Sequence, residues 1–193
     1  MNVDERVLDA IRASYDAALV EDGWGRAVGH ICRLVDAPTG VIYSQDLVTG
    51  RSWHDGAYNF DEESIRLYEE HYGAINPWVQ ALQGQPPTSA VALSSRMVPA
   101  DSYVRTEFHN EFFAPRGLYY SDGIVMGVEG LVMTVMALNR PRRPGPLTDG
   151  QVAVLAVVAP HVQSAFKLWC RIRALEGRAS SMSAALDALT VGI

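Results

Sequence analysis

The segment Ile124-Val-Met-Gly-Val-Glu-Gly-Leu-Val-Met-Thr-Val-Met-Ala-Leu138 decides the fold of this chain. Two apolar runs, 124–127 and 131–138, flank Val128-Glu-Gly130, where glycine permits a tight turn. Their residue types favour strands that lie in the middle of an antiparallel sheet. The remaining segments must therefore supply the neighbouring strands and the helices that cover this sheet.

Further strands and helices are expected before this hairpin. Val41-Ile-Tyr-Ser44 and the residues around Arg51-Ser-Trp-His54 predict a second hairpin, with turn residues between them. A short strand is expected near 90–93. Apolar residues at helical spacing, acidic first turns and X-Pro boundaries predict helices at about 3–18, 23–36, 61–72 and 99–113.

A long apolar helix is expected after the central hairpin. Thr148-Asp-Gly-Gln151 fits a capping box, and apolar residues keep helical periodicity from Val152 to Leu175. Pro160 should kink this helix or start a second segment. One apolar stripe should pack on the sheet and also on a second copy of the chain; it consists of Leu155, Val158, Val162, Ala165, Trp169 and Ile172.

Together these elements predict an α+β fold, an α/β/α sandwich around a central antiparallel β-sheet with a long C-terminal helix. Helices from both ends of the chain should cover one face of the sheet, and a ligand would lie on the other face. One domain is expected at residues 1–177. Residues 178–193, rich in Ser and Ala, are expected to form a linker towards a further C-terminal region.

The composition restricts the class of protein. A chain of 193 residues with 48% hydrophobic content can bury one core, and the net charge is −6. Arg140-Pro-Arg-Arg143 is the one dense basic run and is expected to be a solvated loop, so this chain should not bind nucleic acid. A signal-peptide core and an apolar run of about 18 residues are both absent, which predicts a cytoplasmic protein without a membrane segment.

The sequence contains none of the common enzyme motifs. Nucleophile elbows, P-loops, zinc-protease motifs and dinucleotide turns are absent, and Cys32 and Cys170 lack metal-ligand or disulfide spacing. Candidate catalytic groups without a motif are His71 and His109, each close to glutamates in sequence, and the Cys32 thiol. Residues adjacent in sequence point to different faces of a helix, so such neighbours are poor geometric pairs. We therefore expect no catalytic residue, no metal and no cofactor.

A second informative stretch is Tyr68-Glu-Glu-His-Tyr-Gly-Ala-Ile-Asn-Pro-Trp78. Tyr68 and Tyr72 share one helical face, and Pro77 indicates that the helix ends before Asn76. Aromatic pairs at this spacing most often belong to a core. Beside a turn they also suit the wall of a small-molecule pocket.

Aromatic side chains with a phenol or indole donor offer both apolar rings and hydrogen bonds to a ligand. The amide of Asn76 can donate and accept, which suits a ligand with an amide or carbonyl group. The candidate ligand-binding residues are Trp53, Tyr58, Tyr72, Asn76, Trp78, Tyr103 and Tyr120.

In chain order these features resemble the N-terminal sensor domain of LuxR-type transcription regulators, a relative of the GAF and PAS sensor folds. The resemblance rests on the aromatic helix and turn up to Trp78, on Ala114-Pro-Arg-Gly-Leu118 before the hairpin, and on the long last helix. It covers nearly the full length of the chain.

The resemblance implies a small-molecule-sensing domain that signals as a homodimer to a helix-turn-helix DNA-binding domain outside these residues. In the acyl-homoserine-lactone receptors of this family, an aspartate in an Asp-Pro-Val turn binds the ligand amide, whereas Asn76-Pro77-Trp78 occupies that turn here. A neutral amide makes a hydrogen bond about half as strong as a carboxylate does, so a lactone is expected to bind more weakly. Two other classes remain open, namely a ligand-free dimerisation module and a stand-alone enzyme on this fold.

Overall fold

The fold is built on one antiparallel sheet, seen in a computed structural model that describes residues 2–84 and 89–190, with side chains for 2–82 and 89–183. The strand order is β2-β1-β5-β4-β3. The strands are β1 (Thr39–Asp46), β2 (Ser52–Tyr58), β3 (Val91–Ala92), β4 (Tyr120–Glu129) and β5 (Val132–Arg140). The predicted hairpin is confirmed: β4 and β5 turn at Gly130, whose φ of 61° lies in the left-handed region.

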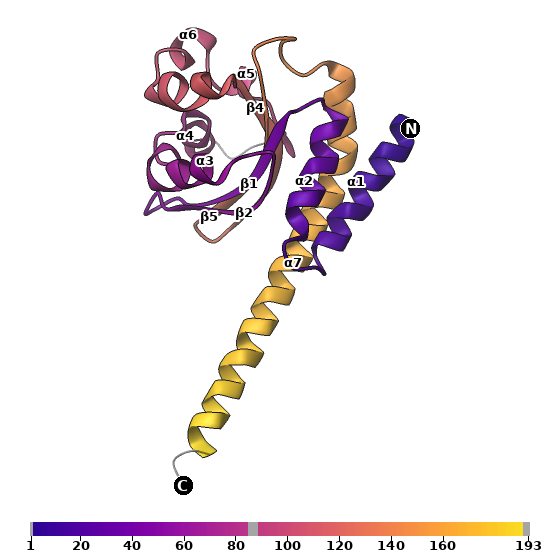
Figure 1. Cartoon of the computed structure of the whole chain (residues 1–193), viewed down its shortest axis with the longest axis vertical. Helices are drawn as coiled ribbons and strands as arrows, with labels where there is room; N and C mark the ends of the chain where they lie inside the picture. The colour runs from indigo at the N-terminus through magenta and orange to yellow at the C-terminus, as the bar shows by residue number, and fades with distance from the viewer. Residues whose placement is uncertain (1, 85–88, 191–193) are drawn as a thin grey trace.

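Helices cover both faces of the sheet (Figure 1). On one face lie α1 (Val3–Ala17), α2 (Gly23–Leu34) and α7 (Asp149–Thr190). The other face carries short helices, namely α3 (Glu62–Leu67), η1 (Tyr68–Tyr72), α4 (Pro77–Gly84), α5 (Ser94–Met97), α6 (Ala100–Tyr103), η2 (Phe108–Phe113) and η3 (Ala114–Arg116). This arrangement confirms the expected α+β sandwich, with the terminal helices together on one face.

Alternation along the strands separates two cores. Ile42, Ile124 and Leu138 point to α2 and α7, on which α1 packs, and are fully buried there. The opposite face packs against an aromatic cluster made by Tyr68, Trp78, Tyr103, Phe108, Phe112, Phe113, Leu118 and Tyr119. The two cores share the sheet, so a change on one face can reach the other through the strands.

The central strands approach each other closely at Gly123. A Cβ added there would lie 1.9 Å from the Met136 carbonyl oxygen, far inside contact distance. Gly123 also lines the aromatic side of the sheet. Any larger residue must therefore push β4 and β5 apart.

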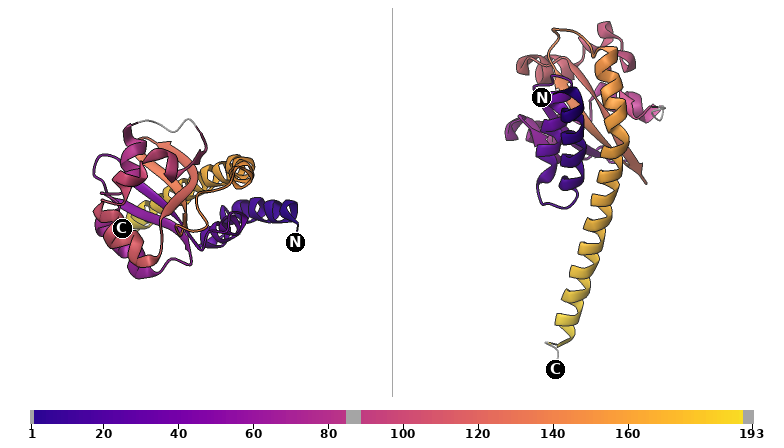
Figure 2. Two further views of the ribbon diagram at one scale, coloured as in Figure 1. Left: turned by 90° about the horizontal axis from the view of Figure 1, so that it is seen from above. Right: turned by 90° about the vertical axis from the view of Figure 1, so that its right-hand side faces the viewer.

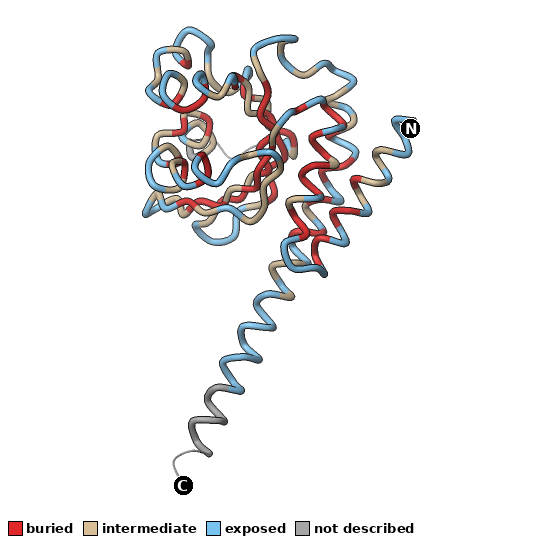
Figure 3. Tube along the Cα trace, in the orientation of Figure 1, coloured by how far each residue is buried: buried red, intermediate tan, exposed pale blue. Residues whose placement is uncertain are grey.

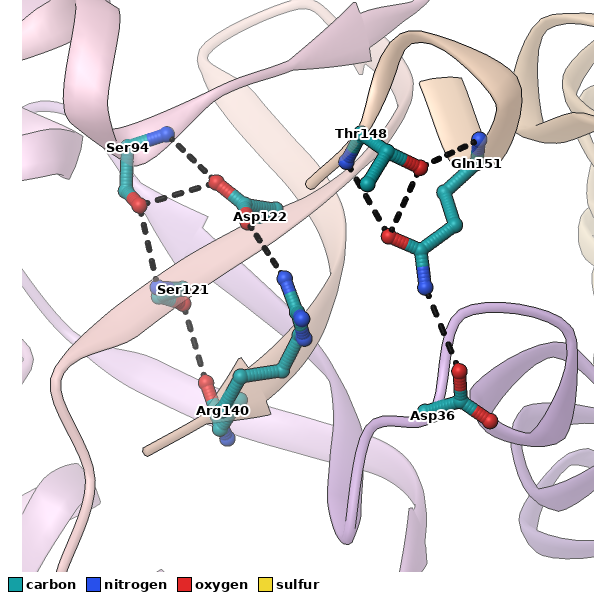
Figure 4. Close-up of polar contacts among 8 residues, drawn as sticks. Asp36, Ser94, Ser121, Asp122, Arg140, Thr148 and Gln151 are labelled. Atoms are coloured by element: carbon teal, nitrogen blue, oxygen red, sulfur yellow. Dashed lines mark hydrogen bonds and ion pairs between the residues drawn. The ribbon is translucent and has the colours of Figure 1, made fainter. Parts of the chain in front are cut away.

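The helix α7 begins as predicted. The Thr148 amide donates to Gln151 Oε1 and the Gln151 amide donates to Thr148 Oγ1, at 3.0 and 3.3 Å, which forms the capping box. Gln151 Nε2 also donates to Asp36 Oδ2 at the end of α2 (Figure 4). The start of α7 is thus tied to the N-terminal helices.

Pro160 does not divide α7, which runs as one helix from Asp149 to Thr190. Proline frees the carbonyl four residues earlier, at Ala156. Both Ala156 and Pro160 are exposed, so water can satisfy that carbonyl. The helix also continues through residue 177, where the domain was expected to end, while residues 191–193 of the expected linker lie outside the described residues.

The second half of α7 extends away from the sheet (Figure 2), and its described side chains beyond Ile172 are exposed (Figure 3). An 18-residue window of α7 has mean hydropathy 1.4, enough by length and composition alone to cross a membrane. Leu155, Val158 and Val162 of the same helix are fully buried in the core. Core packing accounts for these three residues, while Val157 in the same half of the helix is 58% exposed.

Two local predictions are corrected. The single helix expected at 99–113 is broken between α6 and η2, because Thr106 Oγ1 donates to the Tyr103 carbonyl and accepts from the His109 amide. Arg140 is not in a solvated loop: it is 2% exposed at the end of β5, and its Nη1 lies 4.0 Å from Oδ2 of the buried Asp122 (Figure 4). The opposite charge of Asp122 offsets part of the cost of burying this arginine.

Candidate functional site

A cavity lies between the sheet and the aromatic cluster. The space open to the centres of water-sized molecules is about 50 Å³. Strands β1, β4 and β5 form its floor, and the short helices form its roof. Its lining residues are Tyr43, Gln45, Phe60, Tyr68, Asn76, Trp78, Val79, Leu82, Ala92, Met97, Phe108, Phe112, Phe113, Ser121, Gly123, Met133, Val135, Ala137 and Asn139.

Two π-helical turns, η1 and η2, form the roof of this cavity. A π-turn is rare and frequently marks a functional site. The Tyr68 ring from η1 stacks on Tyr43 of β1 with centroids 3.8 Å apart, and Tyr72 stacks on Phe112 of η2 with centroids 4.6 Å apart. The predicted aromatic pair of 68 and 72 thus serves two purposes: Tyr68 contacts the floor, and Tyr72 joins the two π-turns.

Asn76 is the polar group at the end of η1. Its Oδ1 accepts from the amides of Trp78 and Val79, at 3.0 and 3.4 Å, and so caps α4. Its Nδ2 donates to the Tyr68 hydroxyl at 3.0 Å. The amide was expected both to donate to and to accept from a ligand, but the cap occupies its oxygen and leaves only an N–H.

Among the residues that the structure describes, the lining contains no Asp, Glu, Lys, Arg or His. Burial raises the pKa of Tyr68 to about 12 and raises the pKa of Tyr43 well above its ordinary value, so both phenols are neutral. Gln45 Nε2 donates to the carbonyls of Gly50 and Gly73, at 3.1 Å each, which fixes the direction of the amide. Among the described residues the buried Gln45 Oε1 has no hydrogen-bond partner.

A second cavity of about 90 Å³ adjoins the first at Trp78. The Trp78 ring lies between Tyr103, at 4.8 Å between centroids, and Phe113, at 5.3 Å. Tyr103 and Tyr120 line the second cavity, and the buried Tyr103 hydroxyl has no partner in the described part of the chain. Trp78 is therefore a wall shared by both spaces.

The structure brings some of the predicted ligand-binding residues together. Asn76 and Trp78 line the first cavity, Trp78, Tyr103 and Tyr120 line the second, and Tyr72 lies behind the roof. Trp53 and Tyr58 lie on the opposite face of the sheet. Their register partners Ser44 and Gly40 face α2 and α7, and the Tyr58 ring packs on Gly29 of α2.

Sequence reasoning missed most of the floor. Tyr43, Gln45, Ser121 and Asn139 reach the cavity because they occupy one set of alternate positions on β1, β4 and β5. The sequence shows that side chains alternate along these strands. It does not show which set faces the cavity, because that depends on the register of the strands against the helices of the opposite layer. Tyr68 belongs to the aromatic stretch but is not among the predicted ligand-binding residues.

Trp53 lines a separate, open groove of about 630 Å³ between the sheet and α7. Asp55 also lines this groove, at the β-bulge between Ile42 and Tyr43, and accepts from Ser44 Oγ at 2.8 Å. Burial raises the pKa of Asp55 despite this hydrogen bond.

Two of the candidate catalytic groups lie outside the cavity lining. His71 contacts Glu107 at 2.5 Å on the exposed side of the roof, away from the cavity lining. Burial raises the pKa of the Cys32 thiol to about 12, which leaves it protonated. Within the described ranges, no group of three or more His, Cys, Asp or Glu residues is placed to hold a metal ion.

Solved structures of sensor domains share this fold. VqsR LBD domain from Pseudomonas aeruginosa matches with a TM-score of 0.65 and 14% identity, over 89% of this chain and 98% of that chain. The N-acylhomoserine lactone dependent LuxR family transcription factor CepR2 from Burkholderia cenocepacia matches with a TM-score of 0.59 and 16% identity, over 86% and 96%. The GAF domain of a phosphoenolpyruvate-protein phosphotransferase from Coxiella burnetii matches with a TM-score of 0.54 and 12% identity, over 92% and 99%.

No family model and no curated relative matches the chain. The fold is that of LuxR-type ligand-binding domains and of GAF domains, which confirms the resemblance inferred from the residues. These neighbours are ligand-binding or regulatory domains rather than enzymes.

Proposed function

We propose that this chain is the small-molecule-sensing domain of a cytoplasmic transcription regulator of the LuxR type. In this proposal the domain binds a ligand on the aromatic face of its sheet and signals as a homodimer through α7. DNA binding belongs to a separate helix-turn-helix domain. The observation that carries the proposal is the cavity closed by Tyr68, Asn76 and Trp78, at the turn that carries the family resemblance.

The exposed half of α7 supports a dimer of parallel helices. Leu168, Ile172, Leu175, Ala179 and Met182 follow one another at alternating spacings of four and three residues, as in a coiled coil. Leu175 and Met182 are 63% and 67% exposed, so this end of the stripe has no partner among the described residues. A second copy would bury it, and Arg171 and Glu176 occupy the flanking positions that pair between parallel helices.

One contact connects the cavity side of the sheet with this helix. Gln163 Nε2 of α7 donates to the Val125 carbonyl of β4 at 2.7 Å, at the irregularity between Val125 and Gly127. Gly123, two residues earlier on β4, lines the cavity. Movement of β4 on ligand binding would thus act directly on α7.

A ligand-free dimerisation module is the second candidate, and the size of the cavity favours it. A space of about 50 Å³ holds only a few water molecules, because each needs on the order of 10–15 Å³ on this measure. Stacked aromatic rings fill the rest of this layer. The two candidates therefore differ in whether this face opens for a ligand.

Native mass spectrometry of the purified protein, beside a denatured sample, tests both candidates. We expect a dimer that carries a small molecule of constant mass, released on denaturation. A bare dimer that no cell extract converts to an adduct would support the ligand-free module. A monomer in the presence and absence of extract would contradict signalling through α7.

A further inference from the structure

The cavity indicates the chemical class of the ligand, an inference that rests on the proposed sensing function. We propose that the ligand is an uncharged molecule that presents a hydrogen-bond acceptor, such as a ketone oxygen, to Tyr68 and Asn76. Its apolar part extends past Trp78 into the second cavity.

The lining of the two cavities argues against a charged ligand. All described residues that line the first cavity are neutral, so a carboxylate or an ammonium group would enter without a countercharge among them. Burial of an unpaired charge costs several kcal/mol even after relaxation of the protein. The same holds for the second cavity, which is lined by Trp78, Val98, Ala100 and the hydroxyl-bearing Ser and Tyr residues.

The direction of the hydrogen bond follows from Asn76. Two backbone amides of α4 fix its Oδ1, so its Nδ2 must face Tyr68, and the amide cannot be turned round without loss of the cap. The Tyr68 oxygen accepts from Nδ2, which leaves the phenol proton free to donate. Both groups therefore offer hydrogen to a ligand, and a ligand oxygen is the complementary group.

The length of the ligand follows from Trp78. Its ring separates two spaces that are each too small for a ligand of ordinary size, about 50 and 90 Å³. A shift of this one side chain would join them. A ligand with its hydrogen-bond acceptor at Tyr68 and its apolar tail towards Tyr103 would then occupy both cavities.

A series of methyl ketones tests the class: 2-pentanone, 2-heptanone and 2-nonanone, with hexanoate and hexylamine as charged counterparts. Isothermal titration and thermal shift report binding to the full chain. We expect binding of the ketones, tighter with longer chains, and at least about tenfold weaker binding of the charged probes, which corresponds to 1.4 kcal/mol.

Two variants test the contact. Asn76→Asp keeps the cap of α4, because aspartate is as good a cap as asparagine, but it replaces the N–H by an acceptor that also takes the Tyr68 proton. Ketone affinity should fall at least about tenfold, while Tyr68→Phe should lower it about three- to tenfold. In Trp78→Leu the longest ketone should gain most, because the wall between the cavities is smaller.

The outcomes separate the class of the ligand from the sensing site. Hexanoate or hexylamine binding as tightly as the ketones would overturn the proposed class and leave the sensing site in place. Ketone binding that survives both Asn76→Asp and Tyr68→Phe would also overturn it. A chain to which neither ketones nor charged probes bind would overturn the class, whereas the sensing function fails only if no cell extract yields an adduct in native mass spectrometry either.

Discussion

Glycine at position 123 is the residue on which the sheet depends most directly. Gly123→Ala should lower the free energy of unfolding by about 2–3 kcal/mol, since the new methyl group would lie 1.9 Å from the Met136 carbonyl oxygen. Gly127→Ala on the same strand is the control. No atom lies within 4 Å of a Cβ there, so we expect it to be neutral or to gain up to about 1 kcal/mol. Urea unfolding measures both, and equal stabilities would contradict the close approach of the strands.

Asn76 gives a second test at the same scale. Asn76→Ala removes the cap of α4 and the hydrogen bond to Tyr68, and should cost about 1–2 kcal/mol of unfolding free energy. Asn76→Asp retains the capping oxygen, and its carboxylate can accept from the backbone amides of α4 and from the Tyr68 hydroxyl, which offsets part of the cost of the buried charge, so it should lose less stability than Asn76→Ala. Thermal and urea unfolding compare the two variants, and a loss in Asn76→Asp at about pH 4 as large as in Asn76→Ala would mean that the cap contributes little.

Single residues show what the sequence could and could not predict about the site. Asn76 and Trp78 were predictable because the X-Pro turn is a local signal that needs no knowledge of the sheet. Gln45 and Asn139 were not predictable, because the neighbouring residues show that side chains alternate along the strand but not which face of the sheet each side chain occupies. The use of the Asn76 oxygen as a cap depends on the path of α4, and so on three-dimensional structure.

Among the elements, the bulge of β2 predicts a pH dependence. Burial raises the pKa of Asp55 above 3.8, so the folded protein holds a proton there more tightly than the unfolded chain does. Stability contributed by this proton is present at low pH and is lost as the pH rises from 3.8 through the raised pKa.

Asp55→Asn removes this titration and keeps an acceptor for Ser44. The difference in unfolding free energy between parent and variant should change in favour of the variant as the pH rises from about 4 to 7, in urea titrations at fixed ionic strength. A difference that is constant over this range would contradict a raised pKa.

The boundaries of helices and strands were predictable where residues close in sequence determine them. The capping box of α7 and the glycine turn of the central hairpin were both visible in sequence. The π-turns were not, because their extra residue is selected by the packing of Tyr68 on Tyr43 and of Tyr72 on Phe112. The break within 99–113 depends on one side chain, Thr106, whose hydroxyl bonds the backbone on both sides.

For the whole molecule, the proposed parallel dimer predicts an electrostatic pairing. Arg171 of one copy would lie beside Glu176 of the other, so Glu176→Arg should weaken the dimer through like charges. Arg171→Glu combined with Glu176→Arg should restore it. Analytical ultracentrifugation at low and high salt measures the effect, and a double variant no better than the single one would exclude a parallel arrangement.

The fold as a whole was more predictable than the site. Apolar periodicity defines which segments are strands and helices, and a sheet with one helical layer on each face is a common way to bury them. The extent of α7 was underestimated, because a composition rich in Ser and Ala is typical of a linker, although alanine also favours helix.

The unbroken course of α7 through Pro160 has a mechanical consequence. Beyond the core the helix continues for about 20 residues, or about 30 Å at the usual helical rise. A stiff helix amplifies small motions at its base: α7 spans about 40 Å from Gln163 to Thr190, so a tilt of about 10° where Gln163 meets β4 would swing the far end by about 7 Å. A domain attached to the end of α7 would be displaced by this distance. Residues at the cavity would need to move by only a fraction of it.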